Sequence, residues 1–280
     1  MVDFHGHLAL RAAARPDDGV TALASQSFRA PYHLSKPYWD ADTRTLLVQV
    51  VNPTAGILSG DRLESAVSVE PGAAVLLTTP SASRVFCMRA DSPAASSLQH
   101  FNVAPGGWLE VLPEPLVPHR GSRFHQRTVL DVAPGGSAFY ADLLFPGRIA
   151  HGETWAWDRL ILELEVRSGG ELLLRERLDQ TSDHLHALAI LAGSGENASF
   201  GNAVFLAPGL AADSAPPWRA ALHALQTEGV WIGASVLRTG AGWSIKFVAP
   251  DGIRLRHTLA SIRRILSAVA PHLACDARKL

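Results

Sequence analysis

Histidine and cysteine side chains are the residues of this sequence whose types and spacing first suggest chemistry. His5 and His7 lie two residues apart, and so do His184 and His186. On a β-strand this spacing would place both imidazoles of a pair on one face, where they could bind a metal ion. Neither pair has a nearby third ligand of clear spacing, so the alternative is a pair of exposed or locally bonded histidines at each place.

Cys87 is a second candidate for metal chemistry. A small buried hydrophobic residue is one interpretation, and a thiolate metal ligand is the other. The only other cysteine of the chain is Cys275. Two cysteines cannot form a disulfide framework or a four-cysteine zinc site.

A carboxylate, Asp61, closes an unusual loop. Residues 52–63, with the sequence NPTAGILSGDRL, bracket a short apolar pair with a proline and glycines, and Asp61 follows directly. The pattern predicts a tight loop that returns the chain into a strand and holds Asp61 at its end. Asp61 could act chemically there, or it could simply accept backbone N–H bonds in the turn.

The densest basic cluster is the segment 119–125, HRGSRFH, which follows a proline-rich stretch. Its His119, Arg120 and Arg123 could face a protein partner from a rigid loop. The alternative is a solvated charged turn.

Motifs of common enzyme classes are missing from the sequence. None of the lysines, Lys36, Lys246 and Lys279, follows a glycine, as a phosphate-binding Walker A loop would require. The patterns H-E-x-x-H, C-x-x-C and G-x-S-x-G are also absent. Signatures of these enzyme classes are therefore thin in this sequence.

Strands joined by tight turns must position these residues. Pro-Gly pairs begin at Pro71, Pro105 and Pro134, each before an apolar run, and residues 248–252 (VAPDG) are a looser fourth copy. Proline presets φ for the first central position of a turn and glycine accepts a positive φ at the second, so each copy predicts a strand, a tight turn and a strand. The strands predicted around these turns span residues 46–51, 62–69, 74–79, 97–103, 108–112, 126–132, 160–167 and 171–178.

The expected fold is mainly β. We predict a β-helical or solenoid-like stack of short strands, with a sandwich or barrel as alternatives because the turn spacing is irregular. A few α-helices are expected in the C-terminal third: one opens at residues 213–217, and a second runs over about 257–270 and ends at Pro271. No stretch is long or polar enough to be a linker, so residues 1–280 are expected to form a single domain.

Composition excludes several classes of protein. Of the 280 residues, 47% are hydrophobic and only 18% are charged, which excludes intrinsic disorder. The formal net charge of −1 lacks the basic excess of a nucleic-acid-binding protein. We find neither a secretory signal nor a membrane-spanning apolar run, and we expect a cytoplasmic chain that is poorly soluble alone.

Five segments of the chain carry a more specific pattern. They are residues 52–63 (NPTAGILSGDRL), 79–86 (TPSASRVF), 108–115 (WLEVLPEP), 147–153 (GRIAHGE) and 175–178 (RERL). In this order they resemble the landmarks of the UreD family of urease accessory proteins, called UreH in some organisms. The sequence departs from the family pattern at Thr54 and Ala55, where two glycines are common, at Ser59, where glycine is usual, and at Cys87 and Met88.

The resemblance implies a nickel-delivery scaffold and not an enzyme. Members of the family are β-rich, bind the accessory protein UreF, which recruits the GTPase UreG, and dock with them on apo-urease. Nickel would be cargo in transit and not a stably bound cofactor. Oxygen ligands suit transit because they release the ion more readily than a closed thiolate or imidazole site. Four carboxylates in or near the matching motifs could line such a path: Asp61, Asp142, Glu153 and Glu176.

Other interpretations remain open for the same residues. Glu153 could pair with Arg148, and Glu176 with neighbouring arginines. A carbohydrate-active β-solenoid or sandwich enzyme could use Asp61 and Glu153 as acid and base if both faced one cleft. The predicted C-terminal helix could belong to the core or could fill a groove of UreF.

Overall fold

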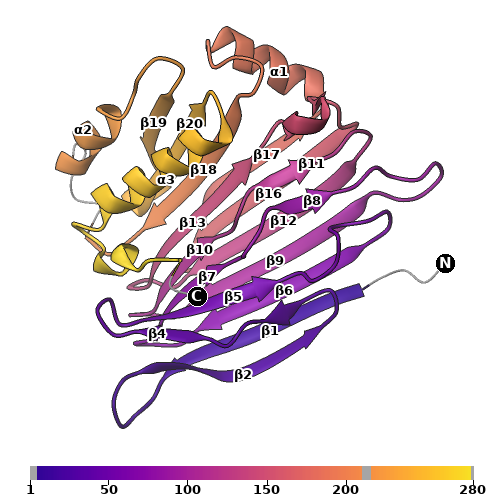
Figure 1. The fold of residues 1–280 in the computed structure, drawn as a ribbon. Helices are drawn as coiled ribbons and strands as arrows, with labels where there is room; N and C mark the ends of the chain where they lie inside the picture. The colour runs from indigo at the N-terminus through magenta and orange to yellow at the C-terminus, as the bar shows by residue number, and fades with distance from the viewer. Residues whose placement is uncertain (1–4, 210–215, 279–280) are drawn as a thin grey trace.

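The computed structural model describes residues 5–209 and 216–278. Two large β-sheets, one of seven strands and one of eleven, face each other (Figure 1). A third sheet has two strands. The prediction of a mainly β chain is confirmed. The label β-helical stays a prediction.

The seven-stranded sheet has the order β17-β16-β12-β9-β6-β1-β2. Its strands are β1 (His5–Ala14), β2 (Thr21–Arg29), β6 (Arg62–Val69), β9 (Ala95–Val103), β12 (Arg123–Val132), β16 (Arg159–Ser168) and β17 (Glu171–Gln180).

The eleven-stranded sheet has the main order β19-β20-β18-β13-β10-β7-β5-β3, with β4, β8 and β11 paired to its side. Its strands are β3 (His33–Leu34), β4 (Tyr38–Asp40), β5 (Thr45–Val51), β7 (Ala74–Thr78), β8 (Ser83–Val85), β10 (Trp108–Leu112), β11 (Leu116–Pro118), β13 (Ser137–Leu144), β18 (Ser199–Leu206), β19 (Trp231–Val236) and β20 (Gly242–Ala249). The two-stranded sheet pairs β14 (Gly147–Arg148) with β15 (Glu153–Thr154).

The three Pro-Gly turns connect the two large sheets. They join β6 to β7, β9 to β10 and β12 to β13, and each carries the chain from the seven-stranded to the eleven-stranded sheet. Gly72, Gly106 and Gly135 all have a positive φ, as the turn prediction requires. The turns also stack, because the N–H of Gly72 donates to the Gly106 carbonyl and the N–H of Gly106 donates to that of Gly135.

The strands that flank these turns are parallel within each sheet. β6, β9, β12 and β16 pair in parallel register, and so do β5, β7, β10 and β13. All eight strand ranges predicted from the sequence coincide with observed strands, most with ends shifted by one to three residues.

The prediction that the fourth turn, at residues 248–252, joins two strands is wrong. β20 ends at Ala249, but the chain then enters helix α3 (Gly252–Leu266) and not another strand. The physical reason is Asp251, whose carboxylate accepts the backbone N–H of Arg254 and caps the helix.

Three α-helices lie in the described residues: α1 (Ser182–Leu191), α2 (Pro217–His223) and α3. The predicted helices correspond to α2 and α3, although α3 begins five residues earlier than expected and residues 213–215 lie outside the described residues. α1 was not predicted. None of the helices in the described ranges is both long and apolar enough to cross a membrane.

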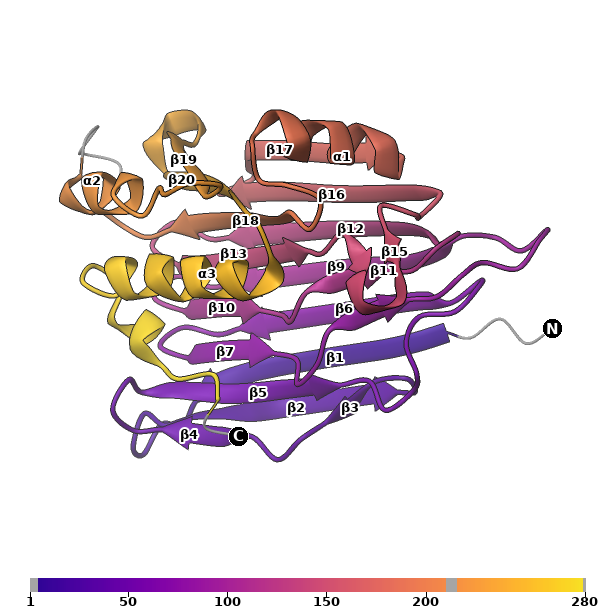
Figure 2. The ribbon, with the colours of Figure 1, turned by 45° about the horizontal axis from the view of Figure 1, so that its top comes forward.

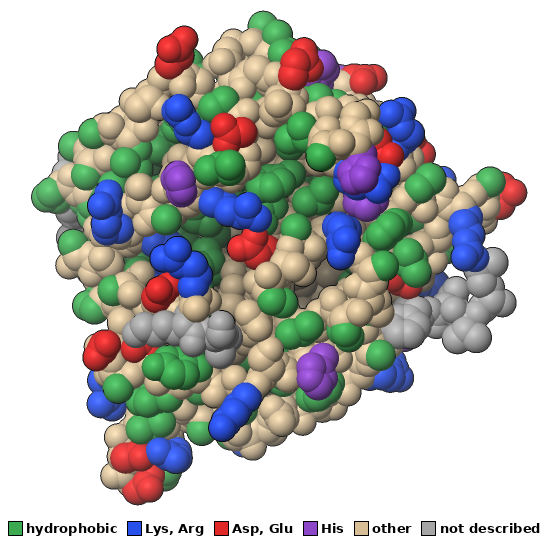
Figure 3. All heavy atoms as spheres, viewed as in Figure 1, with side chains coloured by type: hydrophobic (Ala, Val, Ile, Leu, Met, Phe, Trp, Pro, Cys, Tyr) green, Lys and Arg blue, Asp and Glu red, His purple; other side chains and the backbone are tan. Residues whose placement is uncertain are grey.

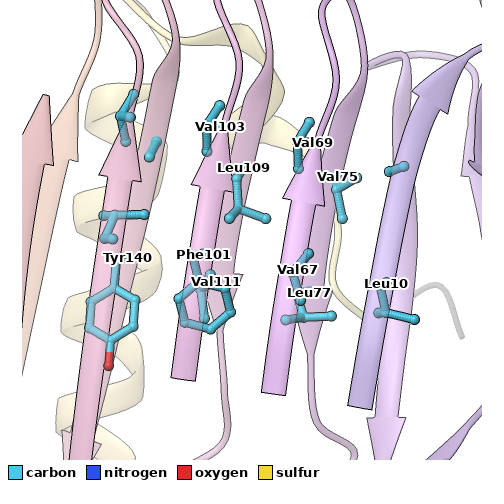
Figure 4. Close-up of a cluster of buried hydrophobic side chains, with 14 of the residues drawn as sticks. Leu10, Val67, Val69, Val75, Leu77, Phe101, Val103, Leu109, Val111 and Tyr140 are labelled. Atoms are coloured by element: carbon cyan, nitrogen blue, oxygen red, sulfur yellow. The ribbon is translucent and has the colours of Figure 1, made fainter. Parts of the chain in front are cut away.

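The main core lies between the two sheets. Leu10, Val67 and Phe101 of the seven-stranded sheet face Leu77 and Val111 of the eleven-stranded sheet (Figure 4). Burying such side chains is the main driving force of the fold, at about 25 cal/mol per Å² of apolar surface.

A second core lies on the other face of the eleven-stranded sheet, which α3 covers (Figure 2). Leu255, Leu259 and Ile262 of α3 are buried there, so the apolar face of this helix belongs to the core. The ring of Trp218, at the start of α2, packs edge-on against Trp243.

Candidate functional site

A cavity of about 790 Å³ lies between the two sheets. Its walls include Phe101 and Leu164 of the seven-stranded sheet and Leu77, Val111 and Tyr140 of the eleven-stranded sheet. Three loops line it as well, at residues 52–57, 79–84 and 113–116. These loops come from the first three segments that resemble the UreD family, so the fold brings those segments to one place.

The first two of these loops are in direct contact. The N–H of Ile57 donates to the Arg84 carbonyl over 2.8 Å, and the N–H of Phe86 donates back to the Ile57 carbonyl over 2.9 Å. Gly56 has φ +148°, and a Cβ there would lie 2.5 Å from the Arg84 carbonyl oxygen. Glycine is therefore required for the close approach.

Asp61 stabilises the first loop. Its Oδ2 accepts the backbone N–H of Leu58 over 2.8 Å, and the side chain is almost fully buried. Burial raises the pKa of the Asp61 carboxyl, and the bond from Leu58 offsets part of this effect. Asp61 is not among the described residues that line the cavity. The structure thus favours the turn-stabilising alternative for this residue.

Asp142 lies on the cavity wall, on the same face of β13 as Tyr140. The phenol of Tyr140 donates a hydrogen bond to Asp142 Oδ2, and Gln126 Nε2 lies 3.5 Å from Oδ1. Burial raises the pKa of Asp142 to about 6, although both hydrogen bonds oppose this rise. Burial and the adjacent carboxylate raise the pKa of Tyr140 well above 10.

Glu176 reaches the same cavity from β17 on the opposite sheet. Its carboxylate forms an ion pair with the ammonium of Lys246 and accepts a hydrogen bond from Asn202 Nδ2 over 3.2 Å. The prediction that Glu176 pairs with a neighbouring arginine is wrong, because Arg177 pairs with Glu163 and Asp179 instead. Adjacent residues of a strand point to opposite faces, so Glu176 and its arginine neighbours cannot meet.

We call Tyr140, Asp142, Glu176, Asn202 and Lys246 the polar cluster. Of its members only the two carboxylates were predicted from the sequence. Asn202 and Lys246 interrupt otherwise apolar strands, and this interruption is the one sequence signal that could have identified them. The polar cluster also links the sheets, since Glu176 belongs to one sheet and the other members to the second.

Glu153 lies apart from the polar cluster. Its carboxylate forms a two-pronged ion pair with Arg148, at 3.0 Å to Nε and 2.5 Å to Nη2, as one alternative anticipated. This pairing lowers the pKa of Glu153. Neither Glu153 nor Asp61 is among the described residues that line the cavity, so the acid–base pair of a carbohydrate-active enzyme has no support in this cavity.

The basic segment is divided by the fold. His119 is buried, packs edge-on against Phe86, and its pKa is lowered mainly by burial. Arg123 is half-buried and donates to the Ser92 carbonyl, whereas Arg120 is exposed. A solvated charged turn is therefore wrong for His119, and a role for these residues in partner binding stays a prediction.

The histidine pairs also differ from expectation. His184 and His186 lie on helix α1 and not on a strand, so their two-residue spacing directs them to different sides. His184 contacts Gln180, and His186 contacts Glu196. His5 and His7 do lie on a strand, β1. Within residues 5–209 and 216–278 no group of three or more His, Cys, Asp or Glu side chains is placed to hold a metal ion.

Cys87 is exposed, so the expectation of a buried hydrophobic residue is wrong.

Ser59, another departure from the family pattern, has a clear structural role, because its hydroxyl accepts the backbone N–H of Arg89 over 2.8 Å. On the face shown in Figure 3, acidic and basic side chains are interspersed and do not form one broad basic area.

The raised pKa of Asp142 gives a pH-dependent prediction. The folded chain binds this proton more tightly than the unfolded chain, because the folded pKa of about 6 exceeds the ordinary value of 3.8. The stabilisation is fully present below about pH 4 and is lost as the pH rises through about 6. Between about pH 3 and 7, the unmodified chain should lose about 3 kcal/mol more stability than Asp142→Asn.

Chemical denaturation across this pH range measures the difference. Equal pH profiles for the two proteins would show that Asp142 titrates normally. Glu165→Gln is the control, because Glu165 pairs with Arg127 and Arg167 and its pKa is lowered.

Comparisons with known proteins agree with the resemblance that the five sequence segments carry. A family model described as "UreD urease accessory protein" matches residues 5–279. A relative from Opitutus terrae, "Urease accessory protein UreD", is 59% identical over 279 residues, which cover 100% of both chains. A protein of the same name from Yersinia enterocolitica is 35% identical over 216 residues, 72% of this chain and 64% of the relative. The Yersinia pestis bv. Antiqua protein is 35% identical over 210 residues, 72% of this chain and 73% of its own.

These matches include a full-length relative at high identity, and the family model spans nearly the whole chain. The chain therefore belongs to the UreD family of urease accessory proteins, whose members are accessory proteins and not enzymes.

Proposed function

We propose that this chain acts in urease maturation as a scaffold that conducts nickel through the cavity between its sheets. In this proposal it binds apo-urease together with UreF and the GTPase UreG in the cytoplasm. Nickel is cargo that passes the polar cluster and is not held as a cofactor. The stacked Pro-Gly turns are the corners of a β-helical body that keeps the two sheets apart.

The observation that carries the proposal is the position of Asp142 and Glu176. They lie on opposite sheets, yet both line one cavity of about 790 Å³. All acceptors offered there by Asp142, Glu176 and Asn202 are oxygen atoms. Oxygen ligands without a closed thiolate or imidazole site favour passage over retention of the ion.

Exposed apolar side chains support the docking of protein partners. Leu191 of α1 is 85% exposed and Trp231 of β19 is 54% exposed. Leu188 and Trp231 also line the cavity, so apolar surface lies next to the proposed route. Apolar patches of this kind on a soluble protein mark contact surfaces.

The test is urease activation with Glu176→Gln. This change keeps the size of the side chain but removes its charge, and we expect urease activity in cells to fall about tenfold. Assembly with UreF, UreG and urease should be unchanged in pull-down experiments, because Glu176 lies inside the cavity. Normal activity with normal assembly would remove Glu176 from the route.

Glu153→Gln and Asp61→Ala serve as comparisons. Glu153 pairs with Arg148 outside the lining of the cavity, so its variant should activate urease normally once it is folded. Loss of Asp61 removes the bond to Leu58 and should act through the stability of the first loop.

A further inference from the structure

Lys246 is the cationic member of the polar cluster. It lies on β20, opposite Asn202 of β18, which in turn lies opposite Asp142 of β13. The three side chains therefore form a row across adjacent strands, directed at the same cavity. The ammonium of Lys246 pairs with Glu176 and donates to Asn202 Oδ1 over 2.8 Å.

The ammonium occupies the place where a metal cation would meet the same oxygen atoms. Glu176 Oε2 and Asn202 Oδ1 both accept from Lys246 Nζ. Asp142, the other acceptor in this row, already accepts hydrogen bonds from Tyr140 and Gln126. Lys246 thus satisfies oxygen acceptors that a divalent cation such as nickel(II) or magnesium would use.

The charges of the polar cluster also favour competition between Lys246 and a divalent cation. With both carboxylates ionised, the polar cluster carries two negative charges and one positive charge, and displacing the ammonium leaves two negative charges. Two negative charges match a divalent cation. The Lys246 side chain is 52% exposed and has a flexible four-carbon stem, so it can leave Glu176 without unfolding of the strand.

We propose that Lys246 is a positioning residue that competes with the metal cation for Glu176 and Asn202, so that the cation binds only while the ammonium is displaced. This inference rests on the proposed function, because it assigns a release step to the same route. A returning ammonium restores the original hydrogen bonds and lowers the affinity for the ion. The polar cluster therefore passes an ion on and does not trap it.

The test is Ni²⁺ binding to the purified full chain, carried on a soluble fusion protein whose own binding is subtracted. Lys246→Met keeps the stem and removes the charge. Equilibrium dialysis should show one Ni²⁺ bound about tenfold more tightly than in the unmodified protein, because a half-exposed charge acts through partly screened interactions. The gain should disappear in Lys246→Met combined with Glu176→Gln.

Lys36→Met is the matched control, since it removes the same charge from an exposed residue elsewhere. If Lys246→Met binds Ni²⁺ no more tightly than Lys36→Met, the proposal that Lys246 competes with the ion is wrong. Should Lys246→Met fail to fold, Lys246→Gln, which keeps an amide donor for Glu176, answers the same question.

The two proposals can fail separately. Normal urease activation by Glu176→Gln would refute the nickel route, whatever Lys246 does to binding. An unchanged Ni²⁺ affinity in Lys246→Met would refute the competition, even if Glu176→Gln abolishes activation.

Discussion

Replacing Arg263 with methionine is expected to lower the free energy of unfolding by about 3–5 kcal/mol, because it leaves a buried carboxylate without its partner. Glu110 on β10 is fully buried, and Arg263 of α3 binds it at 2.5 Å and 3.0 Å. Burial raises the pKa of Glu110, and Arg263 partly offsets that rise. The same guanidinium donates to the Cys275 carbonyl over 2.9 Å, so it also fixes the segment after α3.

Urea denaturation measures the loss, and two further variants show its cause. Glu110→Leu combined with Arg263→Met removes both charges and should recover most of the stability. Arg256→Met removes an exposed partner of Glu114 and should cost about 1 kcal/mol or less. If Arg263→Met were as mild as Arg256→Met, the buried pair would have no special role.

Gly147→Ala is expected to destabilise the chain by about 3 kcal/mol, through a backbone clash added to a strained φ. Gly147 has φ +125°, and a Cβ there would lie 2.1 Å from the Glu153 carbonyl oxygen. Gly147 pairs with Thr154 in the two-stranded sheet, which also brings Arg148 opposite Glu153. The expected loss therefore includes the Arg148–Glu153 ion pair.

Gly152→Ala is the matched comparison in the same segment. Gly152 has φ +66° but no atom within 4 Å of an added Cβ, so only the left-handed conformation is penalised, at about 1 kcal/mol. Thermal unfolding of both variants measures the difference. Equal losses would show that the clash with Glu153 relaxes at no cost.

Local signals explain what the sequence could predict. Each Pro-Gly turn is determined by four adjacent residues, and turn bonds such as Gly107 N–H to the Ala104 carbonyl form within that span. The strands beside the turns were therefore found with only small errors at their ends. Asp251 shows the limit of this reasoning, because one capping carboxylate turned the fourth copy into the start of a helix.

Pairs distant in the sequence could not be predicted. Glu110 and Arg263 are 153 positions apart, and Glu176 and Lys246 are 70 apart. No local pattern links such partners, since a ladder of strand pairings decides which residues share a cavity. Helix α1 lacks a periodic apolar face that would reveal a helix, and the two-residue spacing of His184 and His186 indicates a strand instead.

The five segments that resemble the UreD family have physical roles that the sequence alone did not show. Gly56 allows two of the loops to touch, Glu110 anchors α3, and Gly147 shapes the two-stranded sheet. Glu176, in the last segment, is the one residue of the five segments that belongs to the polar cluster. Most of the pattern therefore maintains the body around the cavity, and only Glu176 of these segments would meet an ion on the proposed nickel route.

The most direct test of the nickel route is the nickel content of urease purified from cells that carry Asp142→Asn combined with Glu176→Gln. Elemental analysis should show nickel per urease active site reduced by about tenfold or more, while Glu165→Gln, a charge removed from an ion pair elsewhere, leaves it unchanged. Pull-downs must show that the accessory proteins and urease still assemble. Full nickel occupancy in the double variant, with assembly intact, would contradict the proposal that nickel passes these carboxylates.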